Sequence, residues 1–416
     1  MVSPPPPRST SECFLNSYVI NHICKFLGTT DIKNCRLVSH ILNYGAIPIL
    51  KKRTVTNFDL DLNILEIVEK WKFRPINVFL SVEICPDIDH LPVDISPINN
   101  LKSIVLHVGG EIGWMMEYCP NIILNSSYTL EELTIIWDEF DPDLPSFEGT
   151  VFQNLTKFVV RGCPGSTDQT VKTIYPAITK SFTKLSHLEL NYYQIIAFAE
   201  LGLVENFPAS INSLVVEGLF DIKVGEWLLQ FPPTLKRLTM KESSYYCDHR
   251  PRLSGAYLDQ LSTTLYNLLK KLSPSLEAFE INMEPYHNIK TVMTLTFPVF
   301  PVMKSFKIIG NPDTFQAVEF ESSPGHFAEI DYKICFPMLE ILEISIAERN
   351  LFPGESEFFP DGCTVVESVK KVGIDFVSLR NDTDKVYAAH LFTRGLEMFP
   401  NAKESLVNSM KKVFQW

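Results

Sequence analysis

The sequence has no long run of apolar residues. None of its apolar stretches reaches the roughly 18 residues that a membrane-spanning helix needs. The opening residues, MVSPPPPRSTSE, contain one early cation followed by prolines, and no uninterrupted apolar stretch precedes His22 and Lys25. A secretory signal peptide requires such a stretch. These absences predict a protein of the cytoplasm and/or nucleus that has no membrane partner.

Motifs of catalysis and metal binding are also missing. The nine cysteines are odd in number, and no two of them stand at a C-x-x-C spacing. This pattern favours reduced, buried thiols over a disulfide framework or a zinc site. There is no G-x-x-x-x-G-K-S/T, no helix-opening G-x-G-x-x-G and no H-E-x-x-H. We therefore expect no catalytic residue, no metal, no cofactor and no enzymatic activity.

Charge is distributed unevenly along the chain. The formal net charge is −12, yet residues 11–57 carry six basic and two acidic residues. Residues 58–416 then carry a net charge of −17. A basic head on an acidic body suggests two surfaces with different partners. An acidic body is poorly suited to nucleic acid, whose phosphates dominate affinity, so no nucleic-acid partner is expected.

Residues 1–10 are proline-rich, and we expect a disordered tail there. Three short helices are predicted after it. The first covers residues 15–27, because its apolar residues recur at intervals of three and four. These residues are Leu15, Val19, Ile20, Ile23, Phe26 and Leu27.

Residues that typically cap or end helices mark the predicted boundaries of the other two helices. Gly28 suits the end of the first helix, and Thr30 is expected to cap the second. The third is predicted from His40 to Ala46, ending before Pro48, because proline lacks the N–H that a helix needs. Residues 11–57 are thus predicted to form a small helical domain.

A second pattern recurs beyond residue 75. It consists of a hydrophobic residue, two variable residues, a hydrophobic residue, one variable residue and a last hydrophobic residue. The ten copies begin at Leu101, Leu130, Leu155, Leu185, Ile211, Leu235, Leu276, Met303, Leu339 and Val369. Their starts lie 24 to 41 residues apart, and the longest interval contains an amphipathic helix at residues 257–272. Most spacings match the ~20–29 residue period of leucine-rich repeats or slightly exceed it.

The spacing within each copy has a direct physical meaning. The last two hydrophobic residues are two positions apart, so both point to one side of a strand. One copy alone cannot bury that side, but stacked copies form a parallel sheet with a continuous core. The competing interpretation is a doubly wound α/β domain, which would not keep one spacing ten times. The sequence therefore predicts an α/β leucine-rich-repeat solenoid over residues 58–416, shaped as a horseshoe with its strands on the concave face.

Residues 15–42, LNSYVINHICKFLGTTDIKNCRLVSHIL, resemble the F-box. The family pattern of spaced apolar residues, Phe-Leu, Asp and Cys-Arg-Leu-Val is matched in register. Asn16 stands where proline is usual, and Leu42 where tryptophan is usual. The second difference predicts weaker adaptor binding. The rest of the chain resembles the irregular leucine-rich repeats found in F-box proteins.

The resemblance implies a substrate-recognition subunit of a Skp–cullin–F-box E3 ubiquitin ligase. In it, the F-box binds the Skp-type adaptor, and through the adaptor a cullin RING ligase, while the repeats bind a protein substrate that the sequence does not name. The expected adaptor contacts are Leu15, Ile23, Leu27, Leu37, Val38 and Leu42. The alternative is a cytosolic leucine-rich-repeat scaffold that is not linked to ubiquitination.

Variable positions within the predicted strands must face the open surface, since they alternate with the core residues. These positions carry repeated carboxylates, and aromatic residues follow several strands. Simple solvation of an exposed sheet explains any one of them equally well. Together they predict a site for a basic segment of the substrate. The expected substrate contacts are Glu189, Tyr192, Glu217, Tyr245 and Glu280.

Overall fold

The computed structural model describes the chain in segments. These are residues 17–59, 74–82, 99–108, 118–137, 147, 149–162, 167–203, 207–218, 220–241, 255–282, 293–310, 315–323, 326–328, 330–346, 358–360, 365–376 and 382–414. The chain divides into two compact units: the first comprises 1–156 and 181–184, and the second 157–180 and 185–416. The predictions for residues 1–10, Leu15 and Tyr245 lie outside the described residues.

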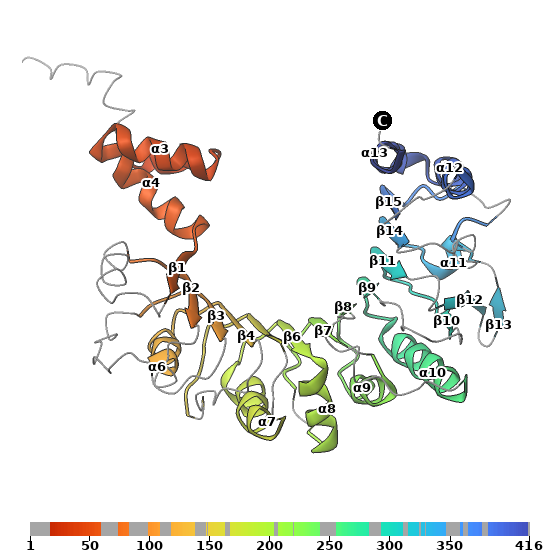
Figure 1. The fold of residues 1–416 in the computed structure, drawn as a ribbon, viewed down its shortest axis with the longest axis horizontal. Coiled ribbons are helices and arrows are strands. Elements are labelled where there is room, and N and C mark those ends of the chain that lie inside the picture. Colours follow the sequence, from red (N-terminus) through yellow and green to blue (C-terminus); the bar gives the residue numbers. More distant parts are fainter. Residues whose placement is uncertain are drawn as a thin grey trace, which may run out of the picture. The chain divides into compact units, whose positions relative to one another are not determined.

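The described part of the first unit begins with three helices, here called the helical head (Figure 1). They are α2 (Ser17–Cys24), α3 (Thr29–Val38) and α4 (His40–Arg53). Their shared core consists of Ile20, Cys24, Ile32, Ala46, Ile49 and Leu50. All six are at most 6% exposed. The head therefore has a small hydrophobic core of its own, to which each helix contributes.

Two predicted helix boundaries in the head are wrong. Helix α3 begins at Thr29 after Gly28, whose carbonyl accepts the amide of Ile32 at 3.0 Å, and no side chain caps it, so Thr30 is not the cap. Helix α4 continues through Pro48 to Arg53 instead of ending at Ala46. Proline costs a helix one hydrogen bond and a local clash. Burial of Ile49 and Leu50 just beyond it offsets that cost.

Four parallel strands follow in the first unit. They are β1 (Thr56–Asp59), β2 (Asn77–Val82), β3 (Ser103–Val108) and β4 (Glu132–Trp137), paired in chain order. Helix α6 (Tyr118–Asn125) lies between β3 and β4 in the sequence. The side-chain amide of Asn77 donates to the carbonyls of Lys51 and Lys52, both at 3.2 Å. This amide fastens the end of α4 to β2.

In the residues that the structure describes, the second unit contributes eight neighbouring strands to one parallel sheet. They are β5 (Lys157–Gly162), β6 (His187–Asn191), β7 (Ser213–Glu217), β8 (Arg237–Lys241), β9 (Ala278–Asn282), β11 (Ser305–Gly310), β14 (Ile341–Ile346) and β15 (Lys371–Phe376). Each of the ten motif copies thus forms a strand, counting β3 and β4, as predicted. Strand register also aligns the copies: Leu188 pairs with Leu214, and Leu214 with Leu238. The hydrophobic positions of neighbouring copies therefore share one buried row.

Helices of the second unit lie between these strands in the sequence or, in the case of α12 and α13, follow the last of them. They are α7 (Thr167–Pro176), α8 (Tyr192–Glu200), α9 (Ile222–Leu228), α10 (Gly255–Leu272), α11 (Tyr332–Cys335), α12 (Asp382–Met398) and α13 (Lys403–Phe414), with the short turns η2 (Ala177–Ser181) and η5 (Pro400–Ala402). Helices α8, α9 and α10 lie on one side of strands β6 to β9 (Figure 1). The helix predicted at residues 257–272 is confirmed as α10. Its apolar side is buried, as Leu261, Leu265 and Leu268 show.

Three further strands form a separate sheet that the motif does not predict. They are β10 (Met293–Phe297), β12 (Phe315–Ser323) and β13 (His326–Ala328). Strand β10 pairs with β12 in parallel, and β12 with β13 in antiparallel orientation. The rings of Phe297 and Phe320 stack with centroids 5.7 Å apart. This sheet therefore occupies the sequence intervals on both sides of β11.

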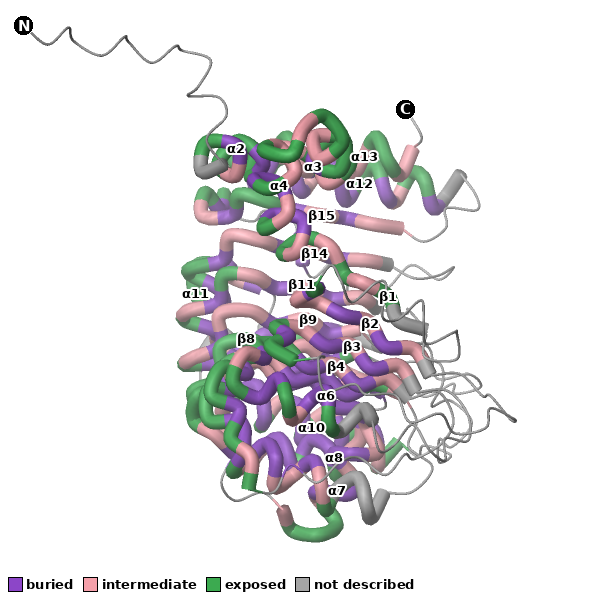
Figure 2. The backbone as a smooth tube through the Cα atoms, turned by 90° about the vertical axis from the view of Figure 1, so that its left-hand side faces the viewer, coloured by how far each residue is buried: buried purple, intermediate pink, exposed green. Residues whose placement is uncertain are grey.

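At least three consecutive residues are buried in β5, β6 and β7. Burial alternates along β8, β9, β11, β14 and β15 (Figure 2). In β9, Phe279 and Ile281 are buried, whereas Glu280 between them is half-buried. We call the side that carries residues such as Glu280 the open face. Helix α13 packs beside β15, where Ser405 accepts the amide of Val372 at 2.9 Å. A helix thus covers the last strand of the order, which blunts a sheet edge.

Candidate functional site

Exposed apolar side chains are concentrated on the helical head. Seven of the fifteen large apolar side chains that are strongly exposed in the described residues lie within residues 17–53. They are Val19, Ile23, Phe26, Leu37, Val38, Ile41 and Tyr44. Leu37 is 86% exposed and Val38 is 73% exposed. Because exposed apolar side chains are normally scattered, this gathering makes the head a candidate interaction surface.

Three of the expected adaptor contacts belong to this exposed set: Ile23, Leu37 and Val38. Two others do not. Leu27 and Leu42 are half-buried and pack against the core of the head. They therefore support the head from within and present little surface to a partner.

Helix α2 has two apolar sides. Ile20 and Cys24 point into the core, whereas Val19, Ile23 and Phe26 are exposed. The predicted single face merges these two stripes. The exposed stripe shows in the sequence as apolar residues at i, i+4 and i+7, which is itself a helical period. Phe26, in the turn after α2, was therefore missed as a surface residue. Ile41 and Tyr44, which lie on α4, were missed as well.

Polar contacts fix the turns that carry the exposed residues. The Arg53 guanidinium donates to the carbonyls of Lys25 and Leu27, which holds the turn after α2. Arg36 Nε donates to Asn43 Oδ1 at 2.8 Å across the turn between α3 and α4. Ser39 caps α4 by accepting the amide of Leu42 at 3.2 Å. Leu37 and Val38 thus stand at the end of a pinned helix, so little ordering is needed on binding.

The second candidate surface is the open face of the second unit. In strand register, Glu189 pairs with Val215, Thr239 with Glu280, and Glu280 with Lys307. The next row along the strands pairs Glu217 with Lys241. Charged residues of both signs therefore stand side by side on neighbouring strands.

Glu189 lies deeper in this face than its strand position predicts. It is 5% exposed, and its carboxylate accepts Arg161 Nε at 2.6 Å. That hydrogen bond is the main reason that the pKa of Arg161 is raised. An ion pair at this depth is costly to break from one side, because a lone charge would remain. The contact that the structure gives the Glu189 carboxylate is therefore the ion pair with Arg161.

Glu217 has the least satisfied carboxylate of this group. Burial raises its pKa, and Glu189 raises it further, while Arg161 and Lys241 oppose the shift. Among the described residues, its Oε2 is a buried atom without a hydrogen-bond partner. Such an oxygen is energetically unfavourable until a donor reaches it. A hydrogen-bond donor from a partner could therefore satisfy the Oε2 atom of Glu217.

Tyr192 is the first residue of α8, which Asn191 caps through a reciprocal capping box with Gln194. The Tyr192 hydroxyl donates to Asp221 Oδ2 at 2.9 Å, while Asp221 Oδ1 accepts the amide of Val224. Burial is the main cause that raises the Tyr192 pKa. The half-buried ring thus ties α8 to the start of α9.

Glu280 remains accessible. It is half-buried, and its carboxylate lies 3.1 Å from Lys307 Nζ. The next strand adds Glu343, which pairs with Lys371. The open face here is a row of alternating charges, suited to a polar segment of another protein.

Metal chemistry and membrane spanning find no support in the described part of the chain. No group of three or more His, Cys, Asp or Glu residues there could hold a metal ion. No helix within those segments is both long and apolar enough to cross a bilayer.

Comparison with known proteins does not add to this picture. No family model matches the sequence, and no curated protein matches it. The resemblance of residues 15–42 to the F-box accordingly rests on its motif residues.

Proposed function

We propose that the chain is the substrate-recognition subunit of a Skp–cullin–F-box ubiquitin ligase. The observation that carries the proposal is the exposure of Leu37 and Val38, at 86% and 73%. These two residues end the Cys-Arg-Leu-Val motif of the F-box resemblance. When a partner covers adjacent apolar side chains that were exposed to water, the free energy of the complex is lowered. A Skp-type adaptor is the partner that the motif implies.

The finer architecture belongs to the same proposal. Residues 11–57 are the F-box, and residues 58–416 are the leucine-rich-repeat horseshoe. Support comes from the ten motif copies, each of which forms a strand in a parallel arrangement. Their hydrophobic positions stay in register, as Phe279, Phe306 and Leu342 do on successive strands.

In this proposal a protein substrate binds the open face of the second unit. Glu217 and Glu280 are accessible to it in part, and the buried oxygen of Glu217 lacks a donor. A basic segment supplies such donors. The receptor itself performs no chemistry; it holds a substrate lysine near the activated ubiquitin, which raises the effective concentration of the reacting groups. The cytoplasm and/or nucleus are the compartments where this assembly works.

A second candidate function is a leucine-rich-repeat scaffold without a link to ubiquitination. The position of Leu42 favours it. Where the F-box family has a tryptophan, this smaller residue packs against the core of the head. The adaptor contact that a tryptophan would make is therefore reduced.

Affinity purification of the tagged full chain tests the proposal. We expect the Skp-type adaptor and a cullin to co-purify with the wild type and to be lost with the double variant Leu37→Asp, Val38→Asp. The matched control is Val365→Asp, because Val365 is 50% exposed and lies in the second unit. It should retain both proteins. Absence of adaptor and cullin from the wild-type sample would leave the scaffold as the better account.

A further inference from the structure

A group of basic residues around the end of α4 has no part in the proposed function. Lys51, Lys52 and Arg53 form the last turn of α4, and Lys25 lies in the turn after α2. Arg74 lies shortly before β2. All five belong to the first unit, and we call them the basic patch. Like charges gathered in one place favour a partner of opposite charge.

Polar contacts hold the end of α4 against the turn after α2. The Arg53 guanidinium donates to the carbonyls of Lys25 and Leu27. Phe26 stands between these two residues in the sequence, and it is 80% exposed. An exposed aromatic ring therefore adjoins the basic patch, where it offers an apolar contact beside the cations.

The same end of α4 is fixed to β2. Asn77 Nδ2 donates to the carbonyls of Lys51 and Lys52, both at 3.2 Å. Burial lowers the pKa of the Lys51 ammonium, and the neighbouring charge of Arg74 lowers it further. These two cations thus lie close enough to repel each other. An anion placed beside them would relieve that repulsion and gain charge-assisted hydrogen bonds.

No carboxylate neutralises the outer part of the patch. Its exposed residues, none of which is ion-paired in the segments that the structure describes, are Lys25, Lys52, Arg53 and Arg74. Asp31 is the one acidic residue between positions 17 and 53. Basic residues in the last turn of a helix often serve to stabilise its dipole. That role does not explain Arg74, because it precedes a strand.

Arg74 also has an unusual backbone conformation. Its φ angle is 47°, in the left-handed region that a residue with a Cβ adopts only at a cost in free energy. Strain of this kind is concentrated at functional positions. The conformation therefore favours a functional role for the Arg74 side chain.

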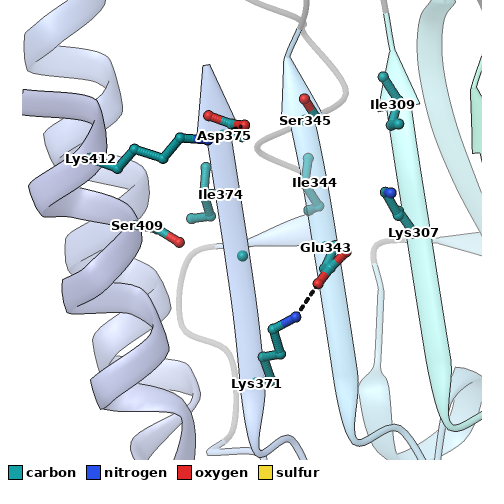
Figure 3. Close-up of a pocket in the computed structure, with 11 residues that line it drawn as sticks. Lys307, Ile309, Glu343, Ile344, Ser345, Lys371, Ile374, Asp375, Ser409 and Lys412 are labelled. Carbon is teal, nitrogen blue, oxygen red and sulfur yellow. Dashed lines mark hydrogen bonds and ion pairs between the residues drawn. The ribbon is translucent and has the colours of Figure 1, made fainter. Parts of the chain in front are cut away.

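Lysines on the open face of the second unit are different. Three of them line a pocket of about 380 Å³ beside α13 (Figure 3). Each is ion-paired: Lys307 with Glu280, Lys371 with Glu343 and Lys412 with Asp375. Their charge is neutralised within the face, whereas the charge of the basic patch is not. The basic patch is therefore the better candidate for an anionic partner.

The basic patch and the surface proposed for the adaptor lie at opposite ends of α4. Leu37 and Val38 end α3, and α4 begins at His40. A helix rises about 1.5 Å per residue, so Lys52 lies roughly 18 Å from His40 along the axis. One partner on Leu37 and Val38 therefore leaves room for another on the patch.

We propose that the basic patch binds an acidic segment of a second protein partner, whose Asp and Glu side chains contact the cations while an apolar side chain covers Phe26. The inference goes beyond the proposed function, because it assigns a different surface and needs neither the adaptor nor a substrate. A long polyanion such as nucleic acid fits less well, since it extends beyond the patch and residues 58–416 carry a net charge of −17. A short segment avoids most of that repulsion, because salt screens charges beyond about 8 Å.

The test uses the full chain and a defined probe, the capped peptide acetyl-Asp-Glu-Phe-Glu-Asp-amide. Its neutral reference is acetyl-Asn-Gln-Phe-Gln-Asn-amide, and NMR titration or calorimetry measures both affinities. We expect the acidic peptide to bind at least about fivefold more tightly at low salt, and the difference to shrink as salt rises. Lys25→Gln combined with Lys52→Gln should remove most of the difference, because both ammonium groups are lost.

Lys333→Gln combined with Lys411→Gln is the matched control for charge. Both residues are exposed and belong to the second unit, so the same net charge is removed from residues outside the patch. This control should change the affinity by less than about twofold. Equal effects of the two double variants, or equal binding of both peptides, would overturn the inference.

Arg74→Gly separates binding from folding. Glycine adopts a positive φ without strain, so this variant should keep or raise the melting temperature while the acidic peptide binds about threefold more weakly. Asn100→Gly is its control, because Asn100 lies in the same unit, has a φ of 59° and carries no charge. It should leave the peptide affinity unchanged. If both variants lose affinity alike, the charge of Arg74 is not what the peptide contacts, and the inference fails.

Two further titrations distinguish other partners. Single-stranded DNA of the same charge as the acidic peptide should bind no more tightly than that peptide. Tighter binding of the DNA, abolished by Lys25→Gln with Lys52→Gln, would replace the inference with a nucleic-acid site. The Skp-type adaptor should bind this double variant as it binds the wild type, since Leu37 and Val38 are unchanged. A parallel loss of adaptor affinity would make the patch part of the adaptor surface and refute a second partner there.

Discussion

The helical head and the open face of the second unit differ in the chemistry they offer. The head exposes apolar side chains, such as Phe26 at 80% and Leu37 at 86%. The open face exposes paired charges, such as Glu280 with Lys307. Apolar contact supplies affinity that salt hardly affects, whereas charge contact supplies specificity and is screened. The receptor that we propose, which must keep one partner and select another, would use both.

The same face of the sheet differs between the two units. On β2 to β4 the row that alternates with the core consists of Phe79, Val105 and Thr134, all half-buried, and the ring of Phe79 lies 6.1 Å from that of His107. On β9 and β11 the corresponding row holds Glu280 and Lys307. The hydrophobic motif is the same in both units, so the motif determines the strand, and the intervening residues determine what it can bind.

The largest effect is expected from the core of the second unit. Trp227 is 1% exposed and contacts the rings of Phe207 and Phe231. Trp227→Ala should lower the free energy of unfolding by about 3–5 kcal/mol, because it leaves a cavity among packed rings. Calorimetry measures the shift, with Val386→Ala as the control, since Val386 is 70% exposed. A change below about 1 kcal/mol would mean that these helices contribute little to the stability of the unit.

A smaller effect on stability is expected in the head, where it should distinguish a residue that packs on the core from a residue that is exposed. Leu27 packs on the core, so Leu27→Asp should destabilise the head by about 2–4 kcal/mol through a desolvated carboxylate. Leu37→Asp should leave stability within about 0.5 kcal/mol, because Leu37 is 86% exposed. Denaturant unfolding followed by circular dichroism compares the two variants. If both lose stability equally, Leu37 is not a surface residue.

Charge substitutions on the open face should have opposite signs. Glu280→Lys should weaken capture of a basic partner by about 1–2 kcal/mol, and Lys307→Gln should strengthen it, since it releases Glu280. Binding of the co-purified partner to each variant is measured at low and high salt. Glu189→Lys is less informative, because it places a second cation beside Arg161 at a buried position. If neither Glu280→Lys nor a rise in salt changes the affinity for the partner, the partner binds to another surface.

Two glutamates of the second unit should have pKa values that are shifted in opposite directions. Lys304 and Lys236 lower the Glu277 pKa to about 2, whereas burial raises the Glu217 pKa above its usual range. The stability that Glu277 contributes is present above its unfolded pKa and lost as pH falls toward 2. Charged Glu217 instead opposes folding above its folded pKa, and this cost disappears as pH falls through it. Glu217→Gln should therefore raise stability at pH 7, by about 0.5 kcal/mol, and have little effect near pH 4. NMR titration of both carboxyls checks the two shifts; equal pKa values would contradict the described surroundings of Glu217.

The sequence predicts the repeated part of the fold well because the spacing has one physical solution. Residues such as Leu188 and Leu190 must share one side of a strand, and they are buried in β6. The β10–β12–β13 sheet has no such period and was not predicted. Helix α4 shows the limit of local rules: Pro48 predicts its end, but the helix runs on where Ile49 and Leu50 reach the core.

The candidate sites could be predicted only in part. The sequence pattern indicates to which side of a helix or strand a side chain points, but not how far that side chain is buried. The prediction that Ile23, Leu37 and Val38 are surface residues is consistent with their exposure. Leu42 lies half-buried against the head, and Glu189 is buried with Arg161. The pocket lined by Lys307, Glu343 and Lys412 was not predicted, because it depends on α13 lying next to β15.

The most direct test of the account is a calorimetric titration of purified Skp-type adaptor into the full chain at about 0.5 M salt, where charge attraction is screened. The account predicts that the wild type binds, and that Leu37→Asp combined with Val38→Asp weakens binding by at least about 100-fold, because two desolvated carboxylates replace apolar contacts. Absence of binding by the wild type, or equal binding by the double variant, would contradict it.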